Sequence, residues 1–158
     1  MKQMEMITPF TDAACQTFKL LLDVDTITET AQKCEEEGNE PCHTDIAIEV
    51  TGDLTGEVLY RFPEETTLEI VKCMSGMEFT AVDEFVLSAL GEIANIISGN
   101  AMTYLSEKDI TCDIQPPKIV DGEPQAAAKQ DLIYSTKINT QIGDVAIMLK
   151  LNPDRLKK

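Results

Sequence analysis

A helix followed by a β-hairpin occurs twice along this chain, and this repeat constrains the fold more than any other feature. The repeat combines apolar residues at helical spacing with extended segments: a helix over 10–22 with strands over 46–50 and 58–62, then a helix over 81–106 with strands over 132–140 and 144–151. In each unit a glycine precedes the second strand, Gly56 in the first and Gly143 in the second. Two such units can lay their helices across one face of a shared sheet. The sequence therefore predicts an α+β fold, an antiparallel sheet with two long helices on one face, built from two related helix-hairpin units.

Capping signals indicate where the two later helices begin and end. Pro63 suits the start of a short helical stretch, and Gly76 suits its end. Thr80 is followed three residues later by Asp83, a spacing that resembles a capping box. We therefore predict that the long helix starts near Ala81.

Length and charge limit the kinds of partner that this chain can have. Its 158 residues, 43% hydrophobic and 26% charged, describe one domain over residues 1–158. The 13 basic and 28 acidic residues give a net charge of −15. Binding to nucleic acid needs Lys and Arg to release counterions from phosphates, and an anionic membrane surface repels a chain of this charge. We expect neither partner.

Nothing in the sequence predicts a membrane span or a targeting signal. No stretch reaches the roughly 18 apolar residues that a membrane span needs. Residues 1–10 lack a basic region followed by an apolar run. We therefore expect a cytoplasmic protein, and we expect the acidic segment 35–40 to be an exposed loop or a frayed helix.

The cysteines and the one histidine raise the question of a metal site. The five cysteines, at positions 15, 34, 42, 73 and 112, form an odd set with no pair separated by two residues, which fits neither a disulfide framework nor a zinc knuckle. Cys42 and His43 are adjacent and Cys34 is near them, but this spacing matches no usual zinc pattern. We expect no metal site, and we expect Cys15 and Cys73 to be small core residues.

The long helix carries one narrow polar stripe. At about 100° per residue, Glu92, Asn95, Gly99 and Met102 all lie within about 40° of Ser88. On the opposite side of the wheel lie the residues expected to be buried: Val86, Leu90, Ile93, Ala94, Ile97, Ala101 and Tyr104. A solvated helix face is the ordinary explanation of such a stripe. However, Gly99 and the nearby Gly91 each cost a helix interior about 1 kcal/mol relative to Ala, so something other than helix propensity favours them.

The spacing Ser88-x-x-x-Glu92-x-x-Asn95-x-x-x-Gly99, with the string Glu-Ile-Ala-Asn-Ile-Ile-Ser-Gly-Asn around it, resembles the signature helix of the CheC/CheX/FliY phosphatases of bacterial chemotaxis. The order of helices and hairpins is similar as well. The resemblance implies a phosphatase that removes phosphate from the phosphorylated Asp of a CheY-type response regulator. Glu92 would pair with a lysine of the regulator, and Asn95 would orient the attacking water. Ser88, Gly99 and Met102 would then contact the partner.

The chemistry of acyl phosphate hydrolysis agrees with that assignment. The reaction passes through a loose transition state, so placing a water in line supplies much of the rate enhancement. A neutral amide can hold the water without bringing another negative charge to the phosphoryl group. The resemblance places Mg²⁺ in the regulator's phosphorylation pocket, so we expect no cofactor in this chain.

The first helix tests whether the chain has a second active centre. The positions that correspond to Ser88, Glu92 and Asn95 carry Asp12, Gln16 and Lys19. Glutamine thus replaces the glutamate and lysine replaces the asparagine, so neither catalytic residue type is repeated in its place. We therefore expect a single active centre, as in the CheX-like members. Those members form homodimers through their sheets, so the resemblance also implies a homodimer here. Gln16 and Lys19 could instead contact a partner, and the sequence leaves this alternative open. An exposed polar helix face is the ordinary explanation of both residues.

Two other functions are compatible with the stripe. A module of the same fold could bind a response regulator without hydrolysis. Alternatively, the stripe could be a structural contact between two copies, but burying Glu92 in such a contact is costly unless its charge is paired. We rank the phosphatase first and the structural contact last.

Overall fold

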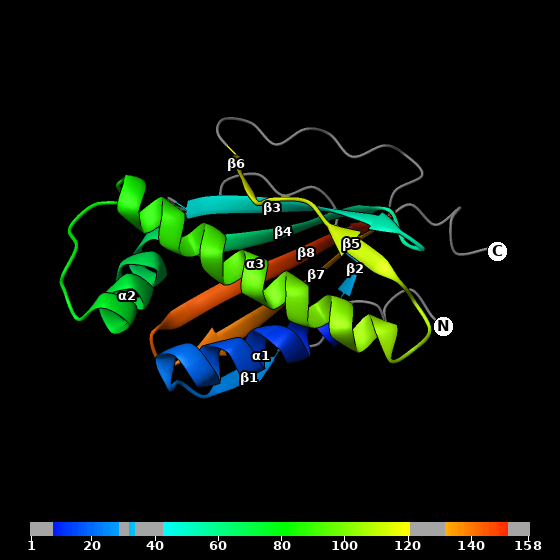
Figure 1. Cartoon of the computed structure of the whole chain (residues 1–158). Helices are drawn as coiled ribbons and strands as arrows, with labels where there is room; N and C mark the ends of the chain where they lie inside the picture. The colour runs from blue at the N-terminus through cyan, green and yellow to red at the C-terminus, as the bar shows by residue number, and fades with distance from the viewer. Residues whose placement is uncertain (1–7, 29–31, 34–42, 121–131, 152–158) are drawn as a thin grey trace.

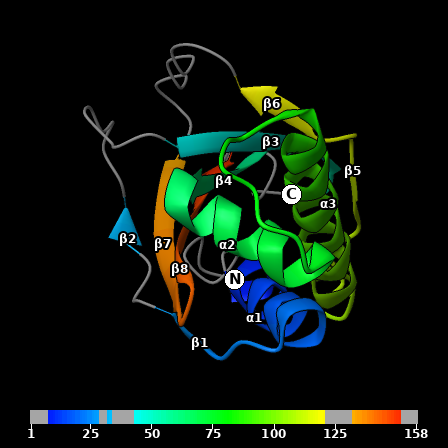
Figure 2. The same ribbon diagram turned by 90° about the vertical axis from the view of Figure 1, so that its left-hand side faces the viewer.

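An antiparallel sheet covered on one face by helices forms the protein (Figures 1 and 2). A computed structural model describes residues 8–28, 32–33, 43–120 and 132–151. The described elements are α1 (Thr8–Leu22), β1 (Thr26–Thr28), β2 (Gln32–Lys33), β3 (His43–Gly52), β4 (Gly56–Pro63), α2 (Glu64–Ser75), α3 (Glu84–Ser106), β5 (Cys112–Ile114), β6 (Lys118–Val120), β7 (Leu132–Thr140) and β8 (Gly143–Leu151). The α+β fold, both helices and both hairpins are confirmed.

The strand order reveals the relationship between the two halves of the chain. Neighbouring strands run β1-β7-β8-β4-β3-β5, with β2 paired to β7 and β6 paired to β3, and every pairing is antiparallel. The second strands of the two hairpins, β4 and β8, meet at the centre. The short strand after α1 pairs with the second hairpin, and the short strand after α3 pairs with the first. Each unit therefore completes the edge of the other in one shared sheet, an exchange that the sequence did not predict.

The core lies between the sheet and the helices, where alternate strand residues point toward α1 and α3. On β3 and β4 the fully buried residues are Ile46, Ile48, Val58, Tyr60 and Phe62. Period-two alternation places such residues on one face of a sheet. The helical contribution includes Phe10, Phe18, Leu90, Ile93 and Ile97, all buried. This packing holds α3 diagonally across the sheet (Figure 1).

The start of α3 differs from the prediction. Asp83 is the N-cap, since its backbone is extended and its carboxylate accepts a 2.9 Å hydrogen bond from the backbone N–H of Val86. The helix therefore begins at Glu84 rather than near Ala81. Thr80 is not the cap, because Asp83 itself satisfies an amide of the first turn. The end of α2 is as predicted: Gly76 adopts a left-handed conformation, with φ of 75°.

The apolar composition of α3 is explained by its packing. By length and composition this 23-residue helix could cross a membrane. The sequence predicted no span, because no stretch reaches the length of uninterrupted apolar residues that a span needs. In the folded chain its buried side rests on the sheet and on α1. A core helix passes the same test of length and composition, so α3 is explained as part of the core.

The cysteine predictions have mixed outcomes. Cys15 is half-buried and packs against the core, whereas Cys73 is exposed on α2. The prediction for Cys73 was wrong because α2 turns this side chain away from the sheet. Cys34, Cys42 and the acidic segment 35–40 lie outside the described residues.

Candidate functional site on helix α3

The five stripe residues lie on the side of α3 that faces away from the sheet. Ser88, Glu92 and Asn95 are exposed, and Gly99 and Met102 are partly buried. The opposite side is buried as predicted, except that Tyr104 is only half-buried. Helical geometry and burial of the apolar side together therefore bring the carboxylate and the amide to the surface, one turn apart.

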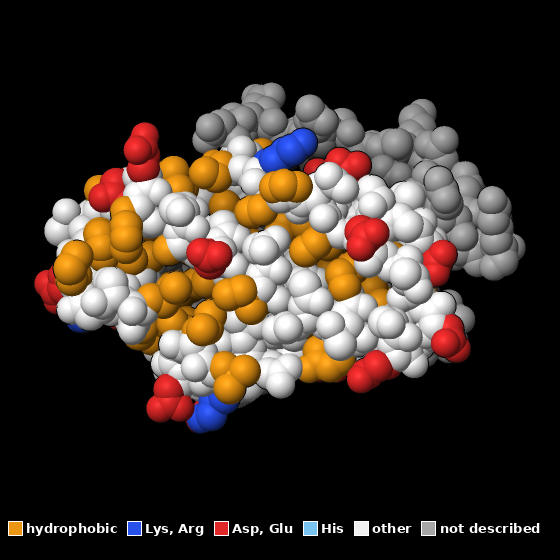
Figure 3. All heavy atoms as spheres, in the orientation of Figure 1, with side chains coloured by type: hydrophobic (Ala, Val, Ile, Leu, Met, Phe, Trp, Pro, Cys, Tyr) orange, Lys and Arg blue, Asp and Glu red, His pale blue; other side chains and the backbone are white. Residues whose placement is uncertain are grey.

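Glu92 and Asn95 make no hydrogen bond or ion pair with the part of the chain that the structure describes. Their polar atoms are therefore available to a partner. In Figure 3 acidic side chains stand singly among hydrophobic and neutral ones on the face that carries α3. A surface of this kind can contact another protein through apolar groups and still place one carboxylate and one amide accurately.

The two glycines of α3 are not required by the packing of the protein itself. A Cβ added at Gly99 would meet nothing within 4 Å. A Cβ added at Gly91 would meet only the ring of Pro117, at 3.7 Å, which is an ordinary van der Waals contact. Both glycines therefore leave open space at the stripe, although each weakens the helix.

A groove opens beside the stripe, and the sequence did not predict it. Its volume is about 330 Å³, and Ser88, Glu92 and Asn95 form one side. The other side includes Pro117 and Ile119, from the segment that carries β6. This groove exists because Lys118–Val120 pairs with β3. Three extended residues after two prolines are too short a signal to predict a strand.

The corresponding face of α1 is occupied by contacts within the protein. The hydroxyl of Tyr104 donates a hydrogen bond to the side-chain oxygen of Gln16. Lys19 forms ion pairs with Asp23 and Asp25, both at 3.4 Å. Both side chains therefore have partners within the protein, and a contact with another protein is not needed to explain them. Asp12 is exposed.

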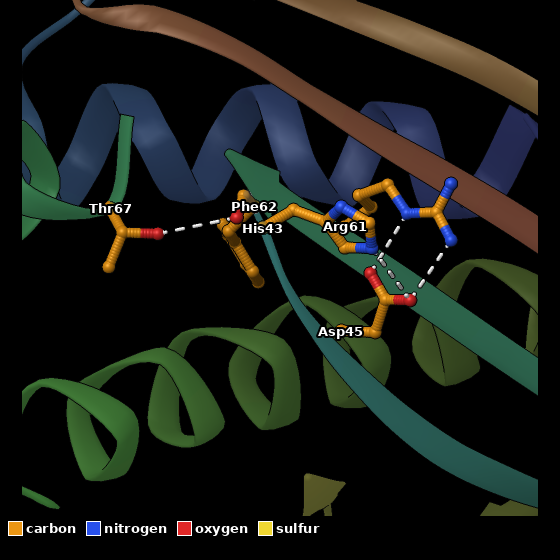
Figure 4. A network of polar contacts seen from close by, with 5 residues as sticks. All are labelled: His43, Asp45, Arg61, Phe62 and Thr67. Carbon is orange, nitrogen blue, oxygen red and sulfur yellow. Dashed lines mark hydrogen bonds and ion pairs between the residues drawn. The ribbon is translucent and has the colours of Figure 1, made fainter. Parts of the chain in front are cut away.

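A second polar cluster, on β3 and β4, is structural. Asp45 lies between His43 and Arg61 (Figure 4). The guanidinium of Arg61 donates to both carboxylate oxygens of Asp45, at 2.9 and 3.0 Å, and His43 Nε2 lies 3.5 Å from one of them. Figure 4 also shows the hydroxyl of Thr67 donating to the carbonyl of Phe62. A buried carboxylate needs such a partner, and the cluster supplies it.

No group of three or more His, Cys, Asp or Glu side chains within the described ranges could hold a metal ion. His43 is instead placed against Asp45 and Arg61. Cys42 and Cys34, the other residues of the candidate metal group, lie outside those ranges. The absence of a metal site therefore stays a prediction.

A family model described as "Chemotaxis phosphatase CheX" matches residues 46–139, more than half of the chain. The chain belongs to the CheX family. The match includes the whole of α3, and with it every residue of the stripe. The segment that matches the family model therefore contains both Glu92 and Asn95.

One curated relative is a CheX protein, and a solved structure has the same fold. The CheY-P phosphatase CheX of Thermotoga maritima is 40% identical over 76 residues, which are 48% of this chain and 49% of that protein. The chain thus spans about half the length of this curated relative. A CheC-like superfamily protein of a Shewanella species has a TM-score of 0.83 at 22% identity, covering 95% of this chain and 99% of the other.

The CheX-CheY-BeF3-Mg complex of Borrelia burgdorferi contains a chain with a TM-score of 0.71 and 22% identity, over 95% of this chain and 99% of that one. At this level of identity the two structural likenesses establish the fold. They bear out the fold predicted from the helix-hairpin repeat.

Proposed function

We propose that this protein is a phosphatase that hydrolyses the phospho-aspartate of a CheY-type response regulator. The observation that carries the proposal is the exposed pair Glu92 and Asn95, one turn apart on α3 and without partners among the described residues. The Thermotoga maritima relative, a CheY-P phosphatase, supports the reaction. The Borrelia burgdorferi structure, a complex of CheX with CheY, supports the partner.

Asn95 is the residue that we assign to the attacking water. Its side chain offers both an acceptor and two donors, so it can hold a water in line with the scissile bond. In a loose phosphoryl-transfer transition state such positioning is most of what a protein can contribute. An aspartate at this position would lose the donors and would add repulsion.

Glu92 is the residue that we assign to docking. Its exposed carboxylate can pair with a lysine at the rim of the regulator's pocket, and that pair becomes partly desolvated in the complex. Because Glu92 and Asn95 are one turn apart on a rigid helix, a pair at Glu92 fixes where the amide of Asn95 enters. The Mg²⁺ of the reaction belongs to the regulator in this proposal, and Ser88, Gly99 and Met102 contact the regulator around the pair.

We place this activity in the cytoplasm, with a homodimer as the expected assembly. The net charge of −15 suits a soluble partner rather than an anionic surface. In the described chain, β1 and β5 end the main strand order of the sheet, and unpaired strand edges favour association. Sedimentation at several protein concentrations would test the dimer.

The decisive experiment compares wild type with Asn95→Ala on a panel of phosphorylated CheY-type regulators. Wild type should accelerate phosphate release from at least one regulator, and Asn95→Ala should not. If every regulator loses phosphate at its own rate in the presence of wild type, the phosphatase proposal is wrong. Regulator binding without faster phosphate release would instead favour the non-catalytic binding module.

A further inference from the structure

Apolar and polar side chains both line the groove beside the stripe. Ile46 of β3 and Leu87 of α3 line it together with Pro117 and Ile119. Ile119 is a large hydrophobic residue with 42% of its surface exposed. A concave site with apolar walls and a few polar groups at one side is typical of a surface that receives a side chain.

Position favours a regulator as the occupant. Glu92 and Asn95 line the groove themselves. Any protein that brings a phosphoryl group to Asn95 therefore covers the groove as well. The volume of about 330 Å³ is enough for one or two apolar side chains at the packing density of an interface.

Charge disfavours a second copy of the chain as the occupant. Helix α3 carries carboxylates at Glu84 and Glu92 and has no Lys or Arg along its length. Two copies that met across this face would bring these carboxylates together. A partner that presents a cation next to an apolar side chain would meet no such repulsion.

Within the described residues the fold does not require glycine at position 91, which borders the groove. The 3.7 Å between an added Cβ and the Pro117 ring leaves room for alanine, and alanine would stabilise the helix. The protein nevertheless has glycine where the helix meets the groove. A partner side chain seated there would use the space that a Cβ at Gly91 would fill.

We propose that this groove is a specificity site, which receives an apolar side chain of the phosphorylated regulator from a segment adjoining the cation that pairs with Glu92. The inference rests on the proposed function and deepens it. Glu92 and Asn95 supply docking and chemistry, while Ile119, Pro117 and Gly91 select which regulator fits.

The test measures binding apart from turnover, with a regulator that carries beryllofluoride and Mg²⁺ in place of the phosphoryl group. Ile119→Asp should raise the dissociation constant about tenfold or more, because it places a charge in an apolar contact. Leu21→Asp is the matched control, since Leu21 is also 42% exposed but lies on α1. Its dissociation constant should stay that of wild type.

Gly91→Ala guards against loss of folding in the first variant. It should raise the melting temperature and yet weaken regulator binding about fivefold, as one added methyl group obstructs the groove. In turnover with phosphorylated regulator the effect of both groove variants should fall on KM rather than on kcat. Ile119→Ala, measured across the regulator panel, should change the order of preference among regulators.

The outcomes separate this inference from the proposed function. Wild-type affinity in both Ile119→Asp and Gly91→Ala overturns the groove site and leaves the phosphatase standing. A change of oligomeric state in Ile119→Asp, with unchanged regulator affinity, also overturns it, because the groove would then join two copies. If wild type binds regulators without hydrolysing the phosphate, the phosphatase proposal is wrong. The affinities of the same variants would still test the groove site. Wild type that binds no regulator defeats both.

Discussion

The hydroxyl oxygens of Tyr60 and Ser98 lie 2.6 Å apart in the core, where they join β4 to α3. Both side chains are fully buried, and burial raises the pKa of Tyr60 above its ordinary value, so its hydroxyl stays protonated. Ser98 lies one turn after Asn95 on α3. This hydrogen bond therefore links α3 to the sheet close to the exposed amide of Asn95.

Removing one partner of that bond should destabilise the protein. Tyr60→Phe leaves the Ser98 hydroxyl buried without its partner, and we expect a loss of about 1–3 kcal/mol in the free energy of unfolding. Urea denaturation followed by circular dichroism measures this loss. In the double variant with Ser98→Ala the loss should be smaller than the sum of the two single losses, and strict additivity would show that the bond contributes nothing.

Asn95→Ala should abolish activity without affecting the fold. The side chain is exposed and makes no contact that the fold needs, so the free energy of unfolding should stay within about 0.5 kcal/mol of wild type. Phosphate release should slow by about 100-fold, because the water loses its positioning group. Asn95→Asp is the isosteric control and should be equally slow. Substantial activity in either variant would remove Asn95 from the mechanism.

Glu92→Lys should act on binding rather than on chemistry. The substitution replaces the attractive charge with a repulsive one at an exposed position, and we expect the affinity for the regulator to fall by about tenfold or more. Isothermal titration with a beryllofluoride-activated regulator measures it. The affinity of Glu92→Gln for the regulator should lie between those of wild type and Glu92→Lys. An unchanged affinity in Glu92→Lys would show that this carboxylate does not dock the regulator.

Gly99→Ala should separate stability from function. An added Cβ meets nothing within 4 Å among the described residues, so the substitution should stabilise the chain by up to about 1 kcal/mol through helix propensity. The same methyl group should weaken regulator binding if the partner approaches Gly99 closely. Thermal denaturation and binding titration give the two quantities. A more stable variant with undiminished affinity would mean that Gly99 is not at the interface.

The cysteines should differ in their reactivity toward a thiol-alkylating reagent. Burial raises the pKa of the Cys112 thiol, and a protonated, covered thiol reacts slowly. Cys73 is exposed and should be modified first. Peptide mapping by mass spectrometry after short exposures compares the two sites directly. Faster labelling of Cys112 in the folded protein would contradict its placement in the core.

Local chemistry in the sequence determined a large part of this structure. The spacing of apolar residues determines the helices, alternation determines the hairpins, and both are properties of neighbouring residues. The exposed pair of Glu92 and Asn95 belongs here too, because residues three apart on a helix share a face in any fold.

The tertiary structure decided what depends on residues distant in the chain. The sequence predicted Thr80 as the cap of α3, and only the hydrogen bond from the backbone N–H of Val86 showed that Asp83 is the cap. Gln16 bonds to Tyr104, 88 positions away, and the groove exists because Ile119 pairs opposite Ile46 across β6 and β3. No local pattern encodes such contacts, since strand pairing and side-chain packing are chosen by the whole chain as it buries its apolar surface.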